Sequence, residues 1–117
     1  MRIVAIRDSV HASDEPEPFK LDIADGTPPM DVLRQTANRR WLPSIQGNRA
    51  TWSIASNQML AVLAYEWPDL KALPFHVDDL MRIGDWRDGA LWLRFNYHAQ
   101  IDPDVVYRVF CGTKLRA

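Results

Sequence analysis

The sequence predicts a single α+β domain over residues 1–117, with a mainly antiparallel sheet packed against two or three helices. Several segments alternate apolar and polar residues, as half-buried strands do. Two other segments carry the capping residues and apolar spacing of helices. These segments do not alternate in the regular order that builds a parallel sheet, and 117 residues fit one domain.

The N-terminal part is expected to contribute two strands. Arg2–Arg7 alternates and is rich in Ile and Val, which predicts the first strand. Residues 9–18 are polar and contain two prolines, so we expect a surface loop. Phe19–Ile23 alternates apolar and charged residues, which indicates a short strand with one solvated face.

The first helix is indicated by its N-terminus and by an apolar stripe. Thr27 is placed to cap the helix, Pro28 suits the first turn, and Asp31 lies near the positive end of the helix dipole. Pro43 is expected to end it. The stripe has spacings of three and four residues: Met30, Leu33, Ala37 and Trp41.

A β-hairpin is expected next. Gly47-Asn48 marks a turn into Arg49–Ala55, in which apolar residues alternate with polar ones. The Met, Leu and Ala content of Gln58–Trp67 also suits a helix capped by Asn57. A turn at Ser56-Asn57 would instead make this segment the second strand of a hairpin, apolar on both faces, and we favour the hairpin.

One undecided element, a turn and a strand follow. Val77–Ile83 fits either a short helix or a strand, and Asp85–Gly89 is predicted to be a turn. Ala90–Ala99 alternates strictly and is predicted to be a strand. The alternation assigns two faces: Leu91, Leu93, Phe95 and Tyr97 on one, and Trp92, Arg94, Asn96 and His98 on the other.

The C-terminal helix is predicted from its cap. Asp102 is in the capping position, Pro103 takes the first helical position, Asp104 adds negative charge, and Gly112 is expected to terminate the helix. The expected buried stripe comprises Val105, Val106, Val109 and Phe110.

Composition excludes several classes of protein. No apolar run is long enough to cross a membrane, and the N-terminus is too quickly charged for a signal peptide. A single cysteine, Cys111, excludes an internal disulfide and a Cys-rich zinc site, so we expect the reducing environment of the cytoplasm. The isolated glycines exclude a P-loop and a dinucleotide fingerprint, and the Gly-x-Ser-x-Gly motif is absent.

Charge is segregated along the chain although the net charge is −1. Residues 8–31 hold seven acids against Lys20 alone, residues 34–49 hold four arginines and no acid, and residues 66–88 hold six acids against three bases. Such blocks favour charged protein partners over nucleic acid. Five tryptophans accompany them, and we expect at least one to be partly exposed: Trp41, Trp52, Trp67, Trp86 and Trp92.

Catalytic and metal-binding candidates are few. Cys111 would lie near the C-terminus of the last helix, where the dipole opposes a thiolate. His76 with Asp78 and Asp79 has no metal-site spacing, and a solvated acidic turn is the preferred interpretation. His98 remains, as a general base held by Asp102 and Asp104, and it is the basis of an alternative hypothesis of a small enzyme.

A nucleic-acid-binding domain is the second alternative. Cations bind phosphates and an aromatic ring can stack on bases. The residues that suggest it are Arg34, Arg39, Arg40, Trp41 and Arg49. Trp41 extends the apolar stripe of the first helix, and the acidic blocks would repel phosphate, so this hypothesis ranks below protein binding.

The chain resembles, in overall format, the bacterial immunity proteins that neutralise a cognate toxin, including those of contact-dependent growth inhibition. The stretches compared are Arg40-Trp41-Leu42-Pro43-Ser44-Ile45, Ala50-Thr51-Trp52 and Phe95-Asn96-Tyr97-His98-Ala99-Gln100. The resemblance implies a cytosolic, cofactor-free, non-enzymatic protein that binds a toxin, such as a nuclease, over its basic active cleft. The acids and the aromatic residue expected to bind the partner are Asp14, Glu15, Glu17, Asp78, Asp79, Asp85, Trp86 and Asp88.

Overall fold

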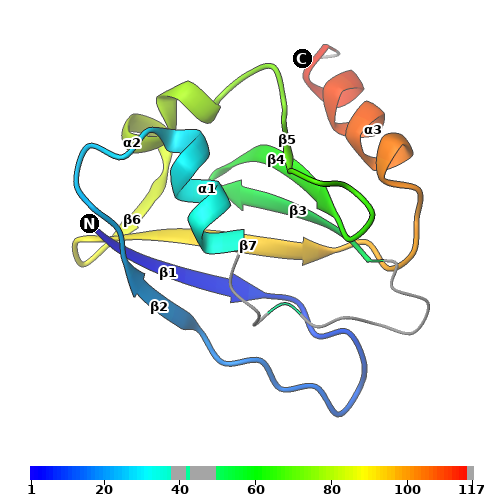
Figure 1. The fold of residues 1–117 in the computed structure, drawn as a ribbon, viewed down its shortest axis with the longest axis horizontal. Coiled ribbons are helices and arrows are strands. Elements are labelled where there is room, and N and C mark those ends of the chain that lie inside the picture. Colours follow the sequence, from blue (N-terminus) through cyan, green and yellow to red (C-terminus); the bar gives the residue numbers. More distant parts are fainter. Residues whose placement is uncertain (38–41, 43–49, 116–117) are drawn as a thin grey trace.

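The computed structural model describes residues 1–37, 42 and 50–115. Within these residues the chain forms a seven-strand mixed sheet, mostly antiparallel, with three α-helices (Figure 1). The predicted α+β class is therefore confirmed. No helix in the described ranges has the length and apolar character needed to cross a bilayer.

The strands follow the order β2-β1-β7-β3-β4-β5, and β6 also pairs with β7. Their bounds are β1 (Arg2–Arg7), β2 (Phe19–Asp22), β3 (Thr51–Ser56), β4 (Gln58–Ala64), β5 (Lys71–Ala72), β6 (Asp85–Arg87) and β7 (Ala90–Tyr97). Every pair is antiparallel except β1 and β7, which run parallel from Arg2 beside Ala90 to Arg7 beside Phe95. The predicted strand at Arg2–Arg7 is confirmed as β1. The strand predicted at Ala90–Ala99 is confirmed as β7, which ends two residues earlier, at Tyr97.

The hairpin between β3 and β4 is also confirmed, and the helical alternative for Gln58–Trp67 is wrong. Asn57 makes the turn with φ 62°, in the left-handed region that Asn tolerates better than most residues. Its side-chain amide donates to the Ile83 carbonyl at 3.1 Å, which ties the turn to the end of α2 (Leu80–Ile83). Below the turn the register shifts between Ile54 and Ala55, as at a β-bulge.

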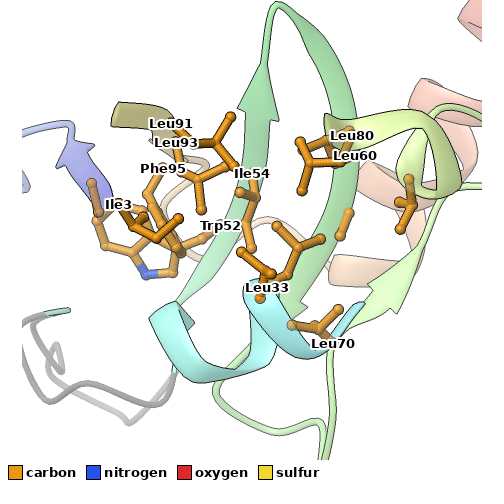
Figure 2. Packing of buried hydrophobic residues seen from close by; sticks show 14 of the residues in the cluster. Ile3, Leu33, Trp52, Ile54, Leu60, Leu70, Leu80, Leu91, Leu93 and Phe95 are labelled. Carbon is orange, nitrogen blue, oxygen red and sulfur yellow. The ribbon is translucent and has the colours of Figure 1, made fainter. Parts of the chain in front are cut away.

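One face of the sheet forms the core against α1 (Pro29–Ala37) and the segment that ends in α2 (Figure 2). The two faces predicted for β7 are confirmed: Leu91, Leu93 and Phe95 are fully buried in this core. Ile3, Ile54 and Leu60 come from the neighbouring strands and pack in the same cluster. Deep apolar burial on one sheet face is thus the main stabilising feature of the fold.

Helix α1 differs from its prediction in start and phase. It begins at Pro29, and the Thr27 hydroxyl donates to the Ala24 carbonyl at 2.6 Å instead of capping the helix. The buried residues are Val32, Leu33 and Thr36, with Met30 and Ala37 only partly buried. Residues 38–41 and 43–49, which include Trp41, Pro43 and the turn at Gly47-Asn48, lie outside the described residues.

The segment after β5 resolves one open question and corrects one prediction. Val77–Asp79 is a 3-10 helix (η1) that leads into α2, so the helical option for Val77–Ile83 holds. The predicted turn at Asp85–Gly89 is wrong for its first three residues, which form β6. Only Asp88 and Gly89 turn, with φ 51° and 79°, as in a two-residue hairpin that returns directly into β7.

Helix α3 (Pro103–Leu115) keeps its predicted cap and part of its predicted stripe but not its predicted end. The Asp102 carboxylate accepts from the Asp104 N–H at 2.9 Å. The helix continues through Gly112, so termination there is wrong. The predicted stripe is wrong for Val105 and Val109, which are 40% and 58% exposed, and correct for Val106, which is buried, and for Phe110, which is half-buried. The inward arc consists of Pro103, Val106, Tyr107 and Phe110.

Candidate functional site

A groove of about 590 Å³ opens at the end of the sheet where β7 begins. Three segments far apart in the sequence form it: the N-terminus, the turn before α1, and the α2–β6 region. Its lining residues are Met1, Asp25, Gly26, Thr27, Pro28, Pro29, Asp78, Met81, Trp86 and Gly89. The wall is mostly apolar, and two acids stand at its rim.

Trp86 is the largest apolar side chain exposed in this groove. It lies on β6 beside Leu91, on the side of the sheet that carries the core, yet it is 42% exposed. The neighbouring helix α2 is a single turn. The indole N–H donates to the Met81 carbonyl at 2.9 Å, and Met81 is itself 38% exposed. Trp86 is therefore held in place while its ring faces solvent, as the sequence predicted for at least one tryptophan.

The opposite wall is anchored by the N-terminus. The Met1 ammonium donates to the Ile23 carbonyl at 2.7 Å and forms an ion pair with Asp25 at 2.8 Å. The hydrogen bond from this ammonium lowers the pKa of the Asp25 carboxyl. Gly26 turns the chain with φ 82°, a left-handed conformation that glycine adopts without strain.

Ion pairs occupy most of the acids around the groove. Asp79 pairs with Arg82 at 3.2 Å and Asp85 pairs with Arg87 at 2.8 Å. Asp78 and Asp88 are exposed and have no ion pair with any described residue. Together with Trp86, these two exposed carboxylates are the predicted residues at this end of the sheet that are available to a partner. Asp78 lies on η1 at the groove wall, and Asp88 lies in the turn beside Gly89.

The remaining predicted acids lie at the other end of β7. Because β1 and β7 are parallel, the loop after β1 leaves the sheet where β7 ends, roughly 25 Å from its start. Asp14 in this loop forms a two-pronged ion pair with Arg7 at 2.7 and 3.0 Å and accepts from the Val10 N–H. These bonds lower the pKa of Asp14 to about 2. Glu15 and Glu17 are exposed. The structure therefore separates the eight predicted residues into two groups.

His98 has partners other than those expected for a catalytic base. Its Nε2 lies 2.8 Å from the Ser53 hydroxyl, and its ring meets Phe110 edge-on. Asp102 caps α3 and Asp104 pairs with Lys71, so neither carboxylate holds the imidazole. Burial lowers the pKa of His98.

Ser53 extends these contacts into a polar row on the second face of the sheet. The Ser53 hydroxyl accepts from the Asn96 amide at 3.3 Å, Asn96 accepts from Arg94 at 3.0 Å, and Arg94 pairs with Asp8 at 2.7 Å. Asp8 also accepts from the Tyr97 N–H. The alternation of the sequence predicted that Arg94, Asn96 and His98 share one face, but no pattern in the sequence indicated this network. Ser53 is fully buried, so the row stabilises the sheet beneath α3 without offering a nucleophile to solvent.

The basic patch can be assessed only at Arg34. This guanidinium pairs with Asp31 at 3.0 Å and with Asp69 at 3.2 Å, and these contacts raise its pKa. Arg39, Arg40, Trp41 and Arg49 lie outside the described residues. Within the described ranges no cluster of three His, Cys, Asp or Glu side chains could hold a metal ion, and Cys111 is a half-buried free thiol.

Comparison with protein-family models, with curated proteins and with solved structures gives no match to this chain.

Proposed function

We propose that this chain is a protein-binding module that neutralises a bacterial toxin by covering its basic active cleft, and that it docks through the groove beside Trp86. The observation that carries the proposal is the exposed indole of Trp86, held against Met81 in a groove that Asp78 also lines, with the exposed Asp88 in the turn that follows β6. The proposed location is the cytoplasm, and the proposed activity requires no cofactor.

The apolar part of the groove would supply the anchor of the interface. Interface hot spots are rich in Trp, and they gain energy when a rim of polar residues excludes water from them. Trp86 already has its indole N–H satisfied by the Met81 carbonyl, so covering the ring would not strand a donor. Pro28 and Pro29 form a rigid wall opposite, which lowers the entropy lost on binding.

The acids would select a basic partner. Asp78 and Asp88 lack internal ion pairs among the described residues, so their field is directed at solvent. A nuclease cleft is basic because it binds phosphates, and carboxylates can occupy such phosphate positions. Complementary charge of this kind speeds encounter, and the effect weakens as salt rises.

The experiment begins with the captured partner and then measures kinetics. The tagged chain is recovered from its native host, the bound protein is identified, and its toxic domain is expressed separately for binding by surface plasmon resonance. Trp86→Ala should weaken binding by about thirtyfold or more, as expected for a central aromatic anchor. The control is Tyr65→Ala, which removes another exposed aromatic ring, directly after β4 and outside the groove lining, and should leave the affinity unchanged.

Charge is tested with a matched pair of variants. Asp78→Lys with Asp88→Asn should slow association about tenfold at low salt, while Glu15→Lys with Glu17→Gln makes the same charge change at the other end of β7 and should have little effect. Asn is chosen at residue 88 because Asp88 has a left-handed φ of 51°. A captured partner without toxic activity would refute the proposal. So would a toxin whose affinity is unchanged by Trp86→Ala and whose association rate is unchanged by the variant at Asp78 and Asp88.

A further inference from the structure

We propose that a second copy of this chain adds to the open edge of β2, so that the two sheets join across a twofold axis at Leu21. Among the described residues β2 is the outer strand of the sheet, and its neighbour is β1 (Figure 1). Outer strands present backbone N–H and C=O groups that another strand can bind. This interface is independent of the groove proposed above.

The hydrogen-bond pattern of β2 determines which backbone groups face outward. Ile23 exchanges both of its backbone bonds with Met1, at 2.8 and 2.7 Å. Bonded and non-bonded pairs alternate in an antiparallel ladder, so Leu21 bonds to Ile3 on β1. The N–H and C=O groups of Lys20 and Asp22 consequently point toward the open edge.

The side chains of β2 are complementary to their own copy. Antiparallel pairing about Leu21 puts Lys20 opposite Asp22 of the second copy, and this pair occurs twice. Both side chains are exposed and lie on the same face. The outward backbone groups belong to these same two residues, so each Lys20–Asp22 contact coincides with a bonded pair, which gives four backbone hydrogen bonds in all.

The charges also exclude the neighbouring registers. A shift by one residue would place Lys20 opposite Leu21 of the second copy. The core face of one sheet would then continue into the solvent-exposed face of the other. A shift by two residues in either direction would place Lys20 opposite Lys20 or Asp22 opposite Asp22, which is repulsive. The register centred on Leu21 is thus the one in which charge and face both agree.

Apolar contacts continue across the same axis. Leu21 is partly buried against the core, beside Ile3, which lies beside Leu91 of β7. Leu21 of the second copy would extend this apolar row. On the other face Arg2 lies opposite Asp22 within one copy, so Asp22 would stand between Arg2 and Lys20 of the second copy.

The opposite edge of the sheet does not offer the same site. β5 has two residues, and the Ala72 carbonyl on it accepts from the Tyr107 hydroxyl at 2.9 Å. Short strands and occupied carbonyls prevent pairing at an edge. A dimer through β2 alone has a small interface, and we expect dissociation constants of roughly micromolar to millimolar size.

Sedimentation equilibrium over about a hundredfold range of concentration, centred on that affinity, tests the proposal. Wild type should dimerise, and Lys20→Asp or Asp22→Lys should each weaken dimerisation about tenfold. Mixing these two variants, or combining them in one chain, should restore association because opposite charges face each other again. The control Glu15→Lys should dimerise like wild type. Wild type that stays monomeric, or a charge swap that fails to restore dimers, would overturn the proposal.

Cross-linking tests the register directly. Non-bonded antiparallel pairs have Cα atoms about 4.5 Å apart, within the range of a disulfide. In a Cys111→Ser background, Leu21→Cys should therefore form a disulfide-linked dimer on mild oxidation, whereas Lys20→Cys should not. Equal cross-linking of both variants would contradict the axis at Leu21. Circular dichroism of each variant confirms that the fold is retained.

Discussion

Replacing Gly84 with alanine tests the packing where α2 meets β6. A Cβ atom at this position would lie 2.6 Å from Leu91 Cδ1, 2.7 Å from the Leu80 carbonyl oxygen and 3.3 Å from the Ser56 hydroxyl. The backbone of Gly84, with φ −63°, is one that alanine adopts readily, so the conflict is one of space. Leu91 could rotate, but the Leu80 carbonyl is backbone and accepts the Gly84 N–H.

This overpacking is expected to lower the free energy of unfolding of the Gly84→Ala variant. Relief of the contact with Leu80 requires the single turn of α2 to move away from the core, and such forced shifts cost about 1–3 kcal/mol. The control is Gly112→Ala, because no atom lies within 4 Å of a Cβ there and the residue is inside α3. Alanine inside a helix is more stable than glycine by about 0.5–1 kcal/mol.

Urea unfolding followed by tryptophan fluorescence and circular dichroism measures both variants. The Gly84→Ala midpoint should fall and the Gly112→Ala midpoint should rise, with unchanged m-values. For a chain of this size, each kcal/mol corresponds to about 3–6 °C in Tm. A Gly84→Ala variant as stable as wild type would refute the steric argument. A destabilised Gly112→Ala variant would show that α3 ends at residue 112, as the sequence had indicated.

Three further measurements address polar groups. Ser56→Ala should lower stability by about 1–3 kcal/mol in the same unfolding assay, because the buried Ser56 hydroxyl donates to one backbone carbonyl and accepts from one backbone N–H. NMR titration should give Asp14 a pKa of about 2. The contribution of this carboxylate to stability is therefore complete above its ordinary pKa of 3.8 and is lost as pH falls through about 2. Arg7→Gln should raise the pKa of Asp14, because the Arg7 guanidinium lowers it. The pKa of His98 should lie below 6.5, so its folded state favours the neutral ring, and stability should decline as pH falls below 6.5; His98→Gln should flatten this decline.

The alternation of apolar and polar residues predicted most strands of the sheet, because successive residues of a strand point to opposite faces and only one face is buried. In β7 the residues assigned to the core face are the buried ones. The hairpin was predictable because Asn57 suits a left-handed turn. β6 was not predictable, since Asp85–Arg87 is only three residues long, with a charged residue at each end, and becomes a strand by pairing with β7.

Helix phase required tertiary information. Val105 and Val109 are as apolar as Val106, so periodicity alone did not identify the buried arc of α3. The choice depends on Tyr107, whose hydroxyl reaches the Ala72 carbonyl on β5. That contact joins α3 to β5, which lie 35 residues apart in the chain, so no local sequence pattern predicts it.

In the candidate groove, too, some residues could be predicted from the sequence and others could not. Trp86 and Asp78 were selected for their chemistry, and both line the groove. The contribution of Met1 and of the turn before α1 was not predictable, because these segments reach Trp86 only through the parallel pairing of β1 with β7. That pairing also carried Asp14 away to the other end of the sheet.

The same parallel pairing has a consequence for biosynthesis. The hairpin of β3 and β4 joins neighbours in the chain and can form early, whereas β1 must wait for β7, the last strand to be translated. Until then the apolar strand β1 has only β2 beside it, and β3 lacks its second neighbour. We therefore expect chains truncated before residue 90 to leave the β7-facing edges of β1 and β3 unpaired and to be prone to aggregation.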